Sequence, residues 1–198
     1  NNRIKVFNSS GAYLRSFGGY GNQCGQWQYA RQFTIYNDVV YIADTYGRKV
    51  KSLTLTGQCK DVWFTGQYPH AIAANSNYVF VGHPSNNISI LDHRLNQRTT
   101  RSINSNYLSY SWGMSINPAG NKLAIADYNK NHVVEFSISG DWLTYTQKTS
   151  STYSSSNGYF QRPTDTGYDS SGNIYVTDLY GHRVQKFNSS LVYQSKVG

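Results

Sequence analysis

The stretch Val176-Thr177-Asp178-Leu179-Tyr180-Gly181-His182-Arg183-Val184-Gln185-Lys186-Phe187 decides the fold of this chain. It begins as a short apolar strand that ends in an acidic residue. A short polar turn follows, and a second strand with alternating apolar positions runs back. Two such strands joined by a tight turn are typical of a β-hairpin. Whether this hairpin recurs along the chain therefore determines the architecture.

The first strand of the hairpin has counterparts earlier in the chain, at residues 39–44, 78–83 and 122–127. The last residues of these strands and of residues 173–178 lie 39, 44 and 51 positions apart in turn. This is the period of a four-stranded propeller blade and not that of a helical solenoid. No window shows a convincing helical stripe with caps, so the pattern predicts all-β meanders of four strands.

The residues of this repeat resemble a known family. Val176 to Phe187 resembles the central motif of the NHL repeat, roughly V-A-D-x-x-N-H-R-V-Q-x-F, and residues 2–7 are similar to its second half. Residues 16–27 resemble the F-G-x-x-G-x-x-x-G-Q-F link between NHL blades. The resemblance covers nearly the whole chain and is weakest at residues 67–110, where Gly82-His83-Pro84 replaces the usual acidic turn. It implies a single all-β domain, residues 1–198, that forms a β-propeller of four-stranded antiparallel blades.

The repeats predict about four and a half blades. The outer half of a blade occurs five times, beginning at Asn2, Arg48, Asn86, Asn131 and His182, and the inner half occurs four times. The resemblance implies a six-bladed ring, completed by residues outside this sequence or by another copy. A small closed ring of four or five blades is the alternative. Because the chain begins with Asn1, we interpret it as a fragment or processed part of a longer chain.

The composition favours a soluble, basic β-protein. Lys and Arg number 18 against 10 Asp and Glu, a formal net charge of +8. Such a surface attracts nucleic acid, anionic glycans or anionic lipids, although no dense basic block is present and the charge can simply maintain solubility. No apolar run approaches the ~20 residues of a membrane helix, so we predict no membrane insertion.

Two cysteines, Cys24 and Cys59, lie 35 residues apart, about one repeat. They could bridge neighbouring blades in an exported protein. We favour the interpretation that they are two unrelated thiols.

Acidic residues close three of the recurring strands, and we assign Asp44, Asp127 and Asp178 a structural role. Each can accept backbone N–H bonds in its turn, or pair with Arg48, His132 or Arg183 respectively. The chain has no nucleophile elbow, phosphate loop or zinc spacing, and we predict no catalytic residue, metal or cofactor. The resemblance also includes metal-dependent amidating lyases, whose ligand His residues have no matching local motif here, so this enzyme class is our second alternative.

Tyrosines and basic residues recur in the blade turns and predict a ligand-binding face. The candidate residues are Tyr46, Arg48, Lys49, His83, Tyr128, Lys130, Tyr180, His182 and Arg183, with Lys51 nearby. The resemblance implies an RNA-binding alternative, because NHL domains of tripartite-motif-type proteins bind RNA through a basic face. The tyrosines would then stack on bases. They could equally pack only on adjacent strands.

Three acceptor sequons for N-glycosylation begin at Asn8, Asn87 and Asn188. Asn8 and Asn188 fall in the corresponding outer hairpin turn of two repeats. The surface is rich in Tyr, Asn, Ser and Gly, which suits adaptable polar recognition. We therefore predict a non-enzymatic scaffold that binds protein or glycan through a propeller face, outside the cell or at its surface. RNA binding and a cytoplasmic location are the alternatives.

Overall fold

The computed structural model describes residues 2–198, so Asn1, with which the predicted domain begins, lies outside the described residues. Every regular element in this range is a β-strand, and no helix in it is long and apolar enough to cross a membrane. The strands are β1 (Arg3–Phe7), β2 (Tyr13–Gly18), β3 (Ala30–Tyr36), β4 (Val39–Asp44), β5 (Lys49–Thr54), β6 (Cys59–Phe64), β7 (Ala71–Ala74), β8 (Val79–Gly82), β9 (Asn87–Leu91), β10 (Gln97–Ser102), β11 (Ser111–Ile116), β12 (Lys122–Asp127), β13 (His132–Ser139), β14 (Trp142–Lys148), β15 (Pro163–Tyr168), β16 (Ile174–Asp178), β17 (Arg183–Phe187) and β18 (Tyr193–Val197).

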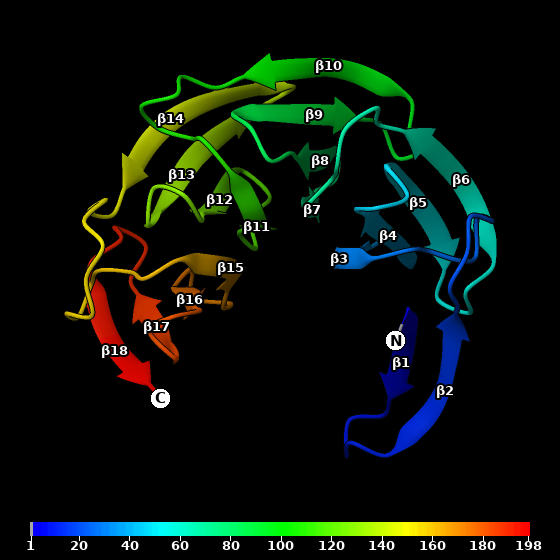
Figure 1. Ribbon diagram of the computed structural model, residues 1–198, viewed down its shortest axis with the longest axis horizontal. Coiled ribbons are helices and arrows are strands. Elements are labelled where there is room, and N and C mark those ends of the chain that lie inside the picture. Colours follow the sequence, from blue (N-terminus) through cyan, green and yellow to red (C-terminus); the bar gives the residue numbers. More distant parts are fainter. Residues whose placement is uncertain (1) are drawn as a thin grey trace.

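Successive strands pair into antiparallel meanders. Four sheets of four strands comprise β3–β6, β7–β10, β11–β14 and β15–β18, and β1 and β2 form a two-stranded sheet. Figure 1 shows these sheets arranged around a common axis, with β3, β7, β11 and β15 innermost. The structure confirms the predicted propeller, including its four complete blades and the additional outer half-blade.

The second strand of a blade is apolar because neighbouring blades cover both its faces. Strands β8 and β12 are buried along nearly their whole length. In the largest core cluster, Phe80 of β8 and Phe136 of β13 pack between two adjacent blades. The β-branched residues Val81 and Ile125 are fully buried in these strands, where they fit the pleated surface.

The arc of blades stays open between β1–β2 and β15–β18 (Figure 1). Strand β16 accordingly alternates between buried and exposed residues, and Tyr175 is 39% exposed, because no further blade covers this side. Phe33 and Ile35 of β3 are also half-exposed, at 50% and 55%. Residues 2–198 therefore do not close a ring of four or five blades, and that alternative is wrong for the described chain. The complete blade number stays a prediction.

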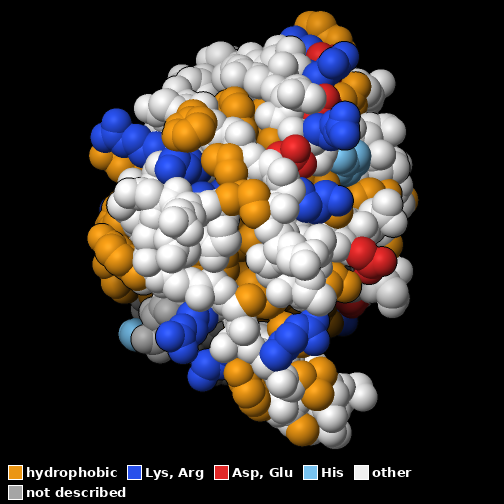
Figure 2. Space-filling view, turned by 90° about the vertical axis from the view of Figure 1, so that its right-hand side faces the viewer, with side chains coloured by type: hydrophobic (Ala, Val, Ile, Leu, Met, Phe, Trp, Pro, Cys, Tyr) orange, Lys and Arg blue, Asp and Glu red, His pale blue; other side chains and the backbone are white. Residues whose placement is uncertain are grey.

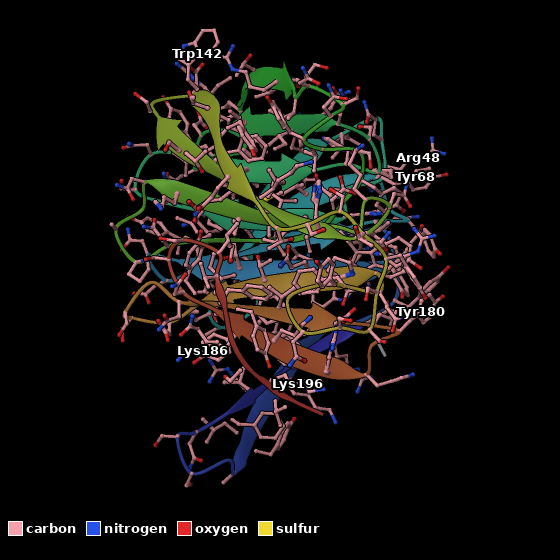
Figure 3. All side chains as sticks on the ribbon, turned by 90° about the vertical axis from the view of Figure 1, so that its left-hand side faces the viewer. Arg48, Tyr68, Trp142, Tyr180, Lys186 and Lys196 are labelled. Carbon is pink, nitrogen blue, oxygen red and sulfur yellow. A yellow bond between two sulfur atoms is a disulfide. The ribbon has the colours of Figure 1, made fainter. Side chains whose placement is uncertain are left out.

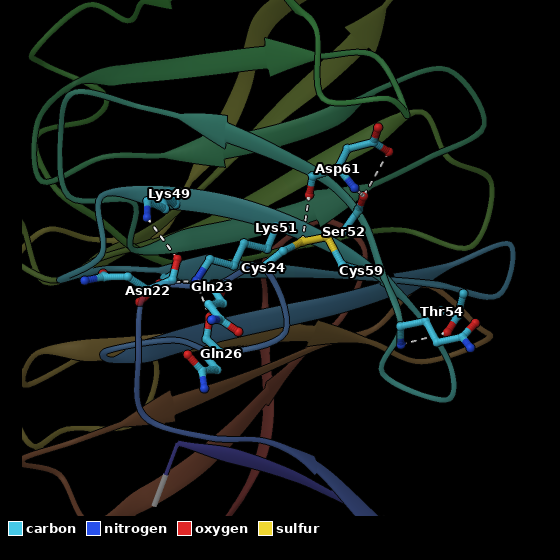
Figure 4. Close-up of a disulfide and its surroundings, with 12 residues drawn as sticks. Asn22, Gln23, Cys24, Gln26, Lys49, Lys51, Ser52, Thr54, Cys59 and Asp61 are labelled. Carbon is cyan, nitrogen blue, oxygen red and sulfur yellow. Dashed lines mark hydrogen bonds and ion pairs between the residues drawn. A yellow bond between two sulfur atoms is a disulfide. The ribbon is translucent and has the colours of Figure 1, made fainter.

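Cys24 and Cys59 form a disulfide, with their Cα atoms 5.5 Å apart (Figure 4). The interpretation of two unrelated thiols is therefore wrong. The spacing of one repeat is also misleading, because the cysteines do not occupy equivalent positions of neighbouring blades. Cys24 lies in the segment between β2 and β3, and Cys59 begins β6, the outermost strand of the blade that this segment enters. The bond thus attaches an incoming connection to the rim of its own blade.

Candidate functional site

Antiparallel meanders place their turns alternately on two faces of the disc. The turns between the second and third strands share one face with the segments that connect the blades. We call this side the link face. It comprises turns 45–48, 83–86, 128–131 and 179–182 and links 19–29, 65–70, 103–110 and 149–162. In the edge-on view of Figure 3, Arg48, Tyr68 and Tyr180 lie along this face, whereas Trp142 lies at the rim away from it.

Buried aspartates attach each link to its turn. Asp44 Oδ1 accepts backbone N–H bonds from Gln28 at 2.9 Å and Tyr29 at 3.2 Å, and from Gly47 at 3.3 Å. A side chain on Gly47 would meet this carboxylate, since an added Cβ would lie 2.2 Å from Asp44 Oδ2. The glycine is therefore required by the close approach of the aspartate.

Asp127 and Asp178 repeat this arrangement in later blades. Asp127 accepts backbone N–H bonds from Ser109 at 2.6 Å and Lys130 at 3.1 Å, and Asp178 accepts one from Gln161 at 2.6 Å. Both carboxylates are fully buried or nearly so. Their geometry holds the link against the turn, and neither carboxylate faces solvent.

A buried basic residue completes each anchor. Arg183 Nε lies 2.9 Å from Asp178 Oδ2, and its other nitrogens donate to the carbonyls of Ser155 at 2.6 Å and Tyr159 at 2.8 Å. The prediction that Arg183 contacts a ligand is wrong, because this side chain is inside the protein and its donors are used.

Lys51 and His132 take the corresponding roles in their blades. Lys51 Nζ lies 3.2 Å from the carbonyl of Gln23 (Figure 4) and 2.8 Å from Asp44 Oδ2. Burial lowers the pKa of this lysine. Lys51, and not the exposed Arg48, is therefore the partner of Asp44, which corrects the predicted pairing. His132 Nε2 lies 4.0 Å from Asp127 Oδ2, and burial lowers its pKa.

His83 replaces the aspartate in the β7–β10 blade. It is 1% exposed, and its Nε2 is 2.9 Å from Ser89 Oγ. Burial lowers the pKa of His83 to about 4, so the ring is neutral at pH 7. The prediction that His83 contacts a ligand is wrong, because the side chain does not reach the surface.

Aromatic and arginine side chains gather above these anchors. We call this set the aromatic–arginine cluster: Tyr29, Arg31, Tyr46, Arg48, Tyr68, Tyr110, Trp112, Tyr128, Arg162 and Tyr180. The ring of Tyr46 lies 4.9 Å from that of Tyr29 and 6.5 Å from that of Tyr68. The ring of Trp112 stacks on that of Tyr128 at 4.2 Å.

Arginines connect these rings into one surface. The guanidinium of Arg31 lies 3.9 Å from the ring centre of Trp112 and 5.9 Å from that of Tyr29, and so joins the two groups of rings. Arg162 lies 4.8 Å from the ring centre of Tyr128. Such cation–π contacts stabilise the orientation of both partners.

Of the predicted ligand residues, the structure brings Tyr46, Arg48, Tyr128 and Tyr180 into this cluster. Arg48 donates to the hydroxyl of Tyr68 at 2.7 Å, and Tyr180 raises the pKa of the Tyr128 hydroxyl through a hydrogen bond. Three others lie in or beside the same turns but outside the cluster: Lys49, Lys130 and His182. Lys49 Nζ instead donates to the carbonyl of Asn22 at 3.2 Å.

Six members of the cluster had not been predicted: Tyr29, Arg31, Tyr68, Tyr110, Trp112 and Arg162. Most of them lie at or just before the beginning of an innermost strand. In β3, Ala30 pairs with Asp44 and Gln32 with Ala43, so Arg31 is an extra residue, and Trp112 is the extra residue in β11. Such β-bulges redirect a side chain, here towards the link face.

Gln32 connects the innermost strands of all four blades across the axis. Its Nε2 donates to the carbonyl of Met114 at 3.0 Å and to Asp165 Oδ1 at 2.8 Å, and its Oε1 accepts the N–H of Ile72 at 2.7 Å. A cavity of about 190 Å³ beside it is lined by Arg31, Trp112 and Asp165, among others. Burial raises the pKa of Asp165 to about 6.

A larger cavity of about 580 Å³ opens on the opposite face, where it is lined by Tyr36, Tyr41 and His93 among others. The hydroxyl of Tyr41 lies 3.0 Å from His93 Nδ1. We place the candidate site on the link face because the exposed aromatic rings and the arginines gather there.

Two further features bear on the predictions. Within residues 2–198, no three His, Cys, Asp or Glu side chains come together to hold a metal ion. Asn8 and Asn188 both lie in turns between a third and a fourth strand, whereas Asn87 is the first residue of β9. Glycosylation at these sequons stays a prediction.

Comparison with solved structures defines the class of the protein as a β-propeller. Virginiamycin B lyase from Staphylococcus aureus is similar with a TM-score of 0.70 and 14% identity, over 99% of this chain and 62% of that one. Hydrazine synthase from Kuenenia stuttgartiensis is similar with a TM-score of 0.66 and 14% identity, over 84% of this chain and 48% of that one. The chain thus spans less than two thirds of either structure.

In the last blade, residues 160–187 match the NHL repeat family model. The chain is therefore a β-propeller whose last blade contains an NHL repeat. A comparison of its sequence with curated proteins finds no match.

Proposed function

We propose that this propeller is a non-enzymatic binding module that recognises a protein or glycan ligand through its link face, outside the cell. The observation that carries this proposal is the aromatic–arginine cluster. Tyr46 and Tyr180 are 59% and 54% exposed, and Tyr29 and Tyr68 are 46% and 39% exposed. Rigid aromatic side chains supply contact area with little loss of conformational entropy, so they are favoured where a protein binds a ligand.

Two features support an extracellular location. The Cys24–Cys59 disulfide is of the kind that persists in oxidising environments. The sequons at Asn8 and Asn188 lie in outer turns, where Asn8 is exposed and a glycan would project into solvent. The similarity to virginiamycin B lyase rests on the fold alone, and we do not extend that activity to this chain.

Protein or glycan binding is favoured over RNA binding because the cations are dispersed. A polynucleotide requires several free cations along its phosphates. Figure 2 shows Lys and Arg side chains as separate patches on the side that it displays. On the link face, Arg48 donates to Tyr68, and Arg162 donates to the carbonyl of Tyr128 at 3.2 Å.

The proposal is tested by measuring the binding of the purified protein to neutral and acidic oligosaccharides, to short peptides and to single-stranded RNA. We expect a saccharide or peptide to bind, and Tyr46→Ala and Tyr180→Ala each to weaken binding by about tenfold. Trp142→Ala is the matched control, because Trp142 is 63% exposed but lies away from the link face. RNA binding alone, or binding that the tyrosine variants leave unchanged, would contradict the proposal.

A further inference from the structure

Arg31 differs from the other arginines of the link face in having donors without partners. Its Nε and Nη1 atoms are buried and make no hydrogen bond within the described part of the chain. Its guanidinium also borders the cavity of about 190 Å³ at the axis, which Trp112 and Thr164 line as well. Buried donors that remain unpaired are costly, so a site of this kind favours a ligand that accepts from them.

Two neighbouring side chains also have unpaired polar atoms. Among residues 2–198, the buried side-chain polar atoms without partners include His70 Nδ1 and Ser111 Oγ. The ring of His70 lies 5.9 Å from that of Trp112, and Ser111 precedes Trp112 in the chain. Unpaired polar atoms thus surround Trp112, and those of Arg31 border the cavity, where they suit a ligand that accepts hydrogen bonds.

The outer rim provides an internal comparison. Arg101 lies 3.9 Å from the ring centre of Trp142, the same distance as between Arg31 and Trp112. Arg101, however, pairs with Asp141 at 2.9 Å and also donates to its carbonyl. Both arginines stack on a tryptophan, but Arg101 on the rim has a carboxylate partner, whereas Arg31 on the link face has none within the described residues.

We infer that the link face binds an acidic saccharide, whose carboxylate or sulfate pairs with Arg31 while a sugar ring lies against the exposed ring of Tyr29, 5.9 Å from the Arg31 guanidinium. This inference rests on the proposed function and names its ligand class. A planar guanidinium matches the oxygens of such an anion in a bidentate pair. The faces of Trp112 are covered by Arg31 and Tyr128, whereas the ring of Tyr29 is 46% exposed and offers the apolar surface that the C–H face of a sugar requires. A single unmatched arginine suits isolated acidic groups better than the continuous phosphates of RNA.

Asp165 is the acidic residue that lines the same cavity, and its Oδ1 already accepts hydrogen bonds from Gln32 and the N–H of Thr166. This carboxyl is therefore directed into the inner-strand network, where its burial raises its pKa to about 6. At mildly acidic pH the carboxyl is largely protonated, so it repels a bound anion only weakly.

The test compares the binding of an oligogalacturonide with that of its methyl ester, which has the same sugar units without the charge. We expect the wild-type protein to bind the acid at least about tenfold more tightly, and Arg31→Gln to abolish this preference. Arg101→Gln is the control, and it keeps the preference. A sulfated, carboxylate-free carrageenan oligosaccharide forms a second arm, and Arg31-dependent binding in either arm supports the inference and identifies the anion. Thermal unfolding verifies that both variants fold.

Other outcomes overturn the inference and separate it from the proposed function. The acid and its ester could bind equally, and Tyr46→Ala could abolish the binding of both. That result refutes the role of Arg31 but leaves the link face as a binding surface. Arg31-dependent binding of an acidic peptide or of RNA, with no saccharide bound, refutes the ligand class. If no probe binds the link face, both the inference and the proposed function fail.

Discussion

Replacing Asp165 by Asn should stabilise the protein at neutral pH, although it removes a charged group from a hydrogen-bond network. The carboxyl is directed at Gln32 in the centre of the propeller, and burial raises its pKa to about 6. An asparagine keeps the two acceptor contacts, because its Oδ1 can still accept from Gln32 Nε2 and from the N–H of Thr166. The substitution therefore removes the charge while it preserves the shape and the hydrogen bonds.

The magnitude and the sign follow from the two states of the chain. In the unfolded chain this carboxyl has a pKa of about 4. Between about pH 4 and pH 6 the unfolded chain therefore binds fewer protons at this site than the folded chain, and the free energy of unfolding falls as pH rises. The buried charge of Asp165 lowers the free energy of unfolding by about 3 kcal/mol, and this loss is complete above about pH 6. Asp165→Asn should recover up to this amount at pH 7.5 and nothing at pH 4.

Urea unfolding of both proteins between pH 4 and pH 8 measures this difference. Asp169→Asn is the control in the same blade, because its partly exposed carboxylate has a lowered pKa owing chiefly to the hydrogen bond from Asn173. That variant should gain no stability at neutral pH. If Asp165→Asn gives no gain at pH 7.5, or a gain that does not change with pH, the carboxyl is not desolvated as the structure describes.

Two further predictions concern the anchors of the links. The variant Cys24→Ser/Cys59→Ser should lose about 4 kcal/mol of unfolding free energy, the loop-closure value for a separation of 35 residues, without change in the native far-UV spectrum. The reduced wild-type protein should unfold with the same free energy as the variant. A variant that is still less stable than the reduced wild-type protein would contradict this explanation. Arg183→Met should lower stability by about 3–5 kcal/mol in urea unfolding, because it leaves the buried Asp178 without its charge partner. Adding Asp178→Asn should restore part of this loss, and no restoration would show that packing dominates.

The strands and blades could be predicted because their signals are local. Each hairpin repeats within a short stretch, and its apolar positions record burial between neighbouring blades, as at Val81 and Ile125. The disulfide could not be predicted in the same way. Its formation depends on the path by which the link containing Cys24 crosses the rim of the next blade, and no periodicity encodes that path.

The candidate site was predicted only where it follows the repeat. Tyr46, Tyr128 and Tyr180 were found because they lie within two residues of a recurring aspartate. Arg31 and Trp112 were missed because they meet across the axis from positions 81 residues apart. Both also lie at β-bulges, which interrupt the alternation of the strand, so the sequence pattern does not show that these side chains point to the link face.

The errors at Arg183 and His83 indicate how the repeat divides its residues between folding and recognition. The positions that define the motif, such as Asp178 and Arg183, are buried because they bind the link, and their donors and acceptors are satisfied there. A side chain that anchors the link of its blade in this way has no polar atoms left for a ligand. On the proposed function, specificity lies at the positions that the motif does not specify: the residues after the aspartate, such as Tyr180, and the bulge residues, such as Arg31. Exchanging those positions between blades should alter binding while the propeller still folds.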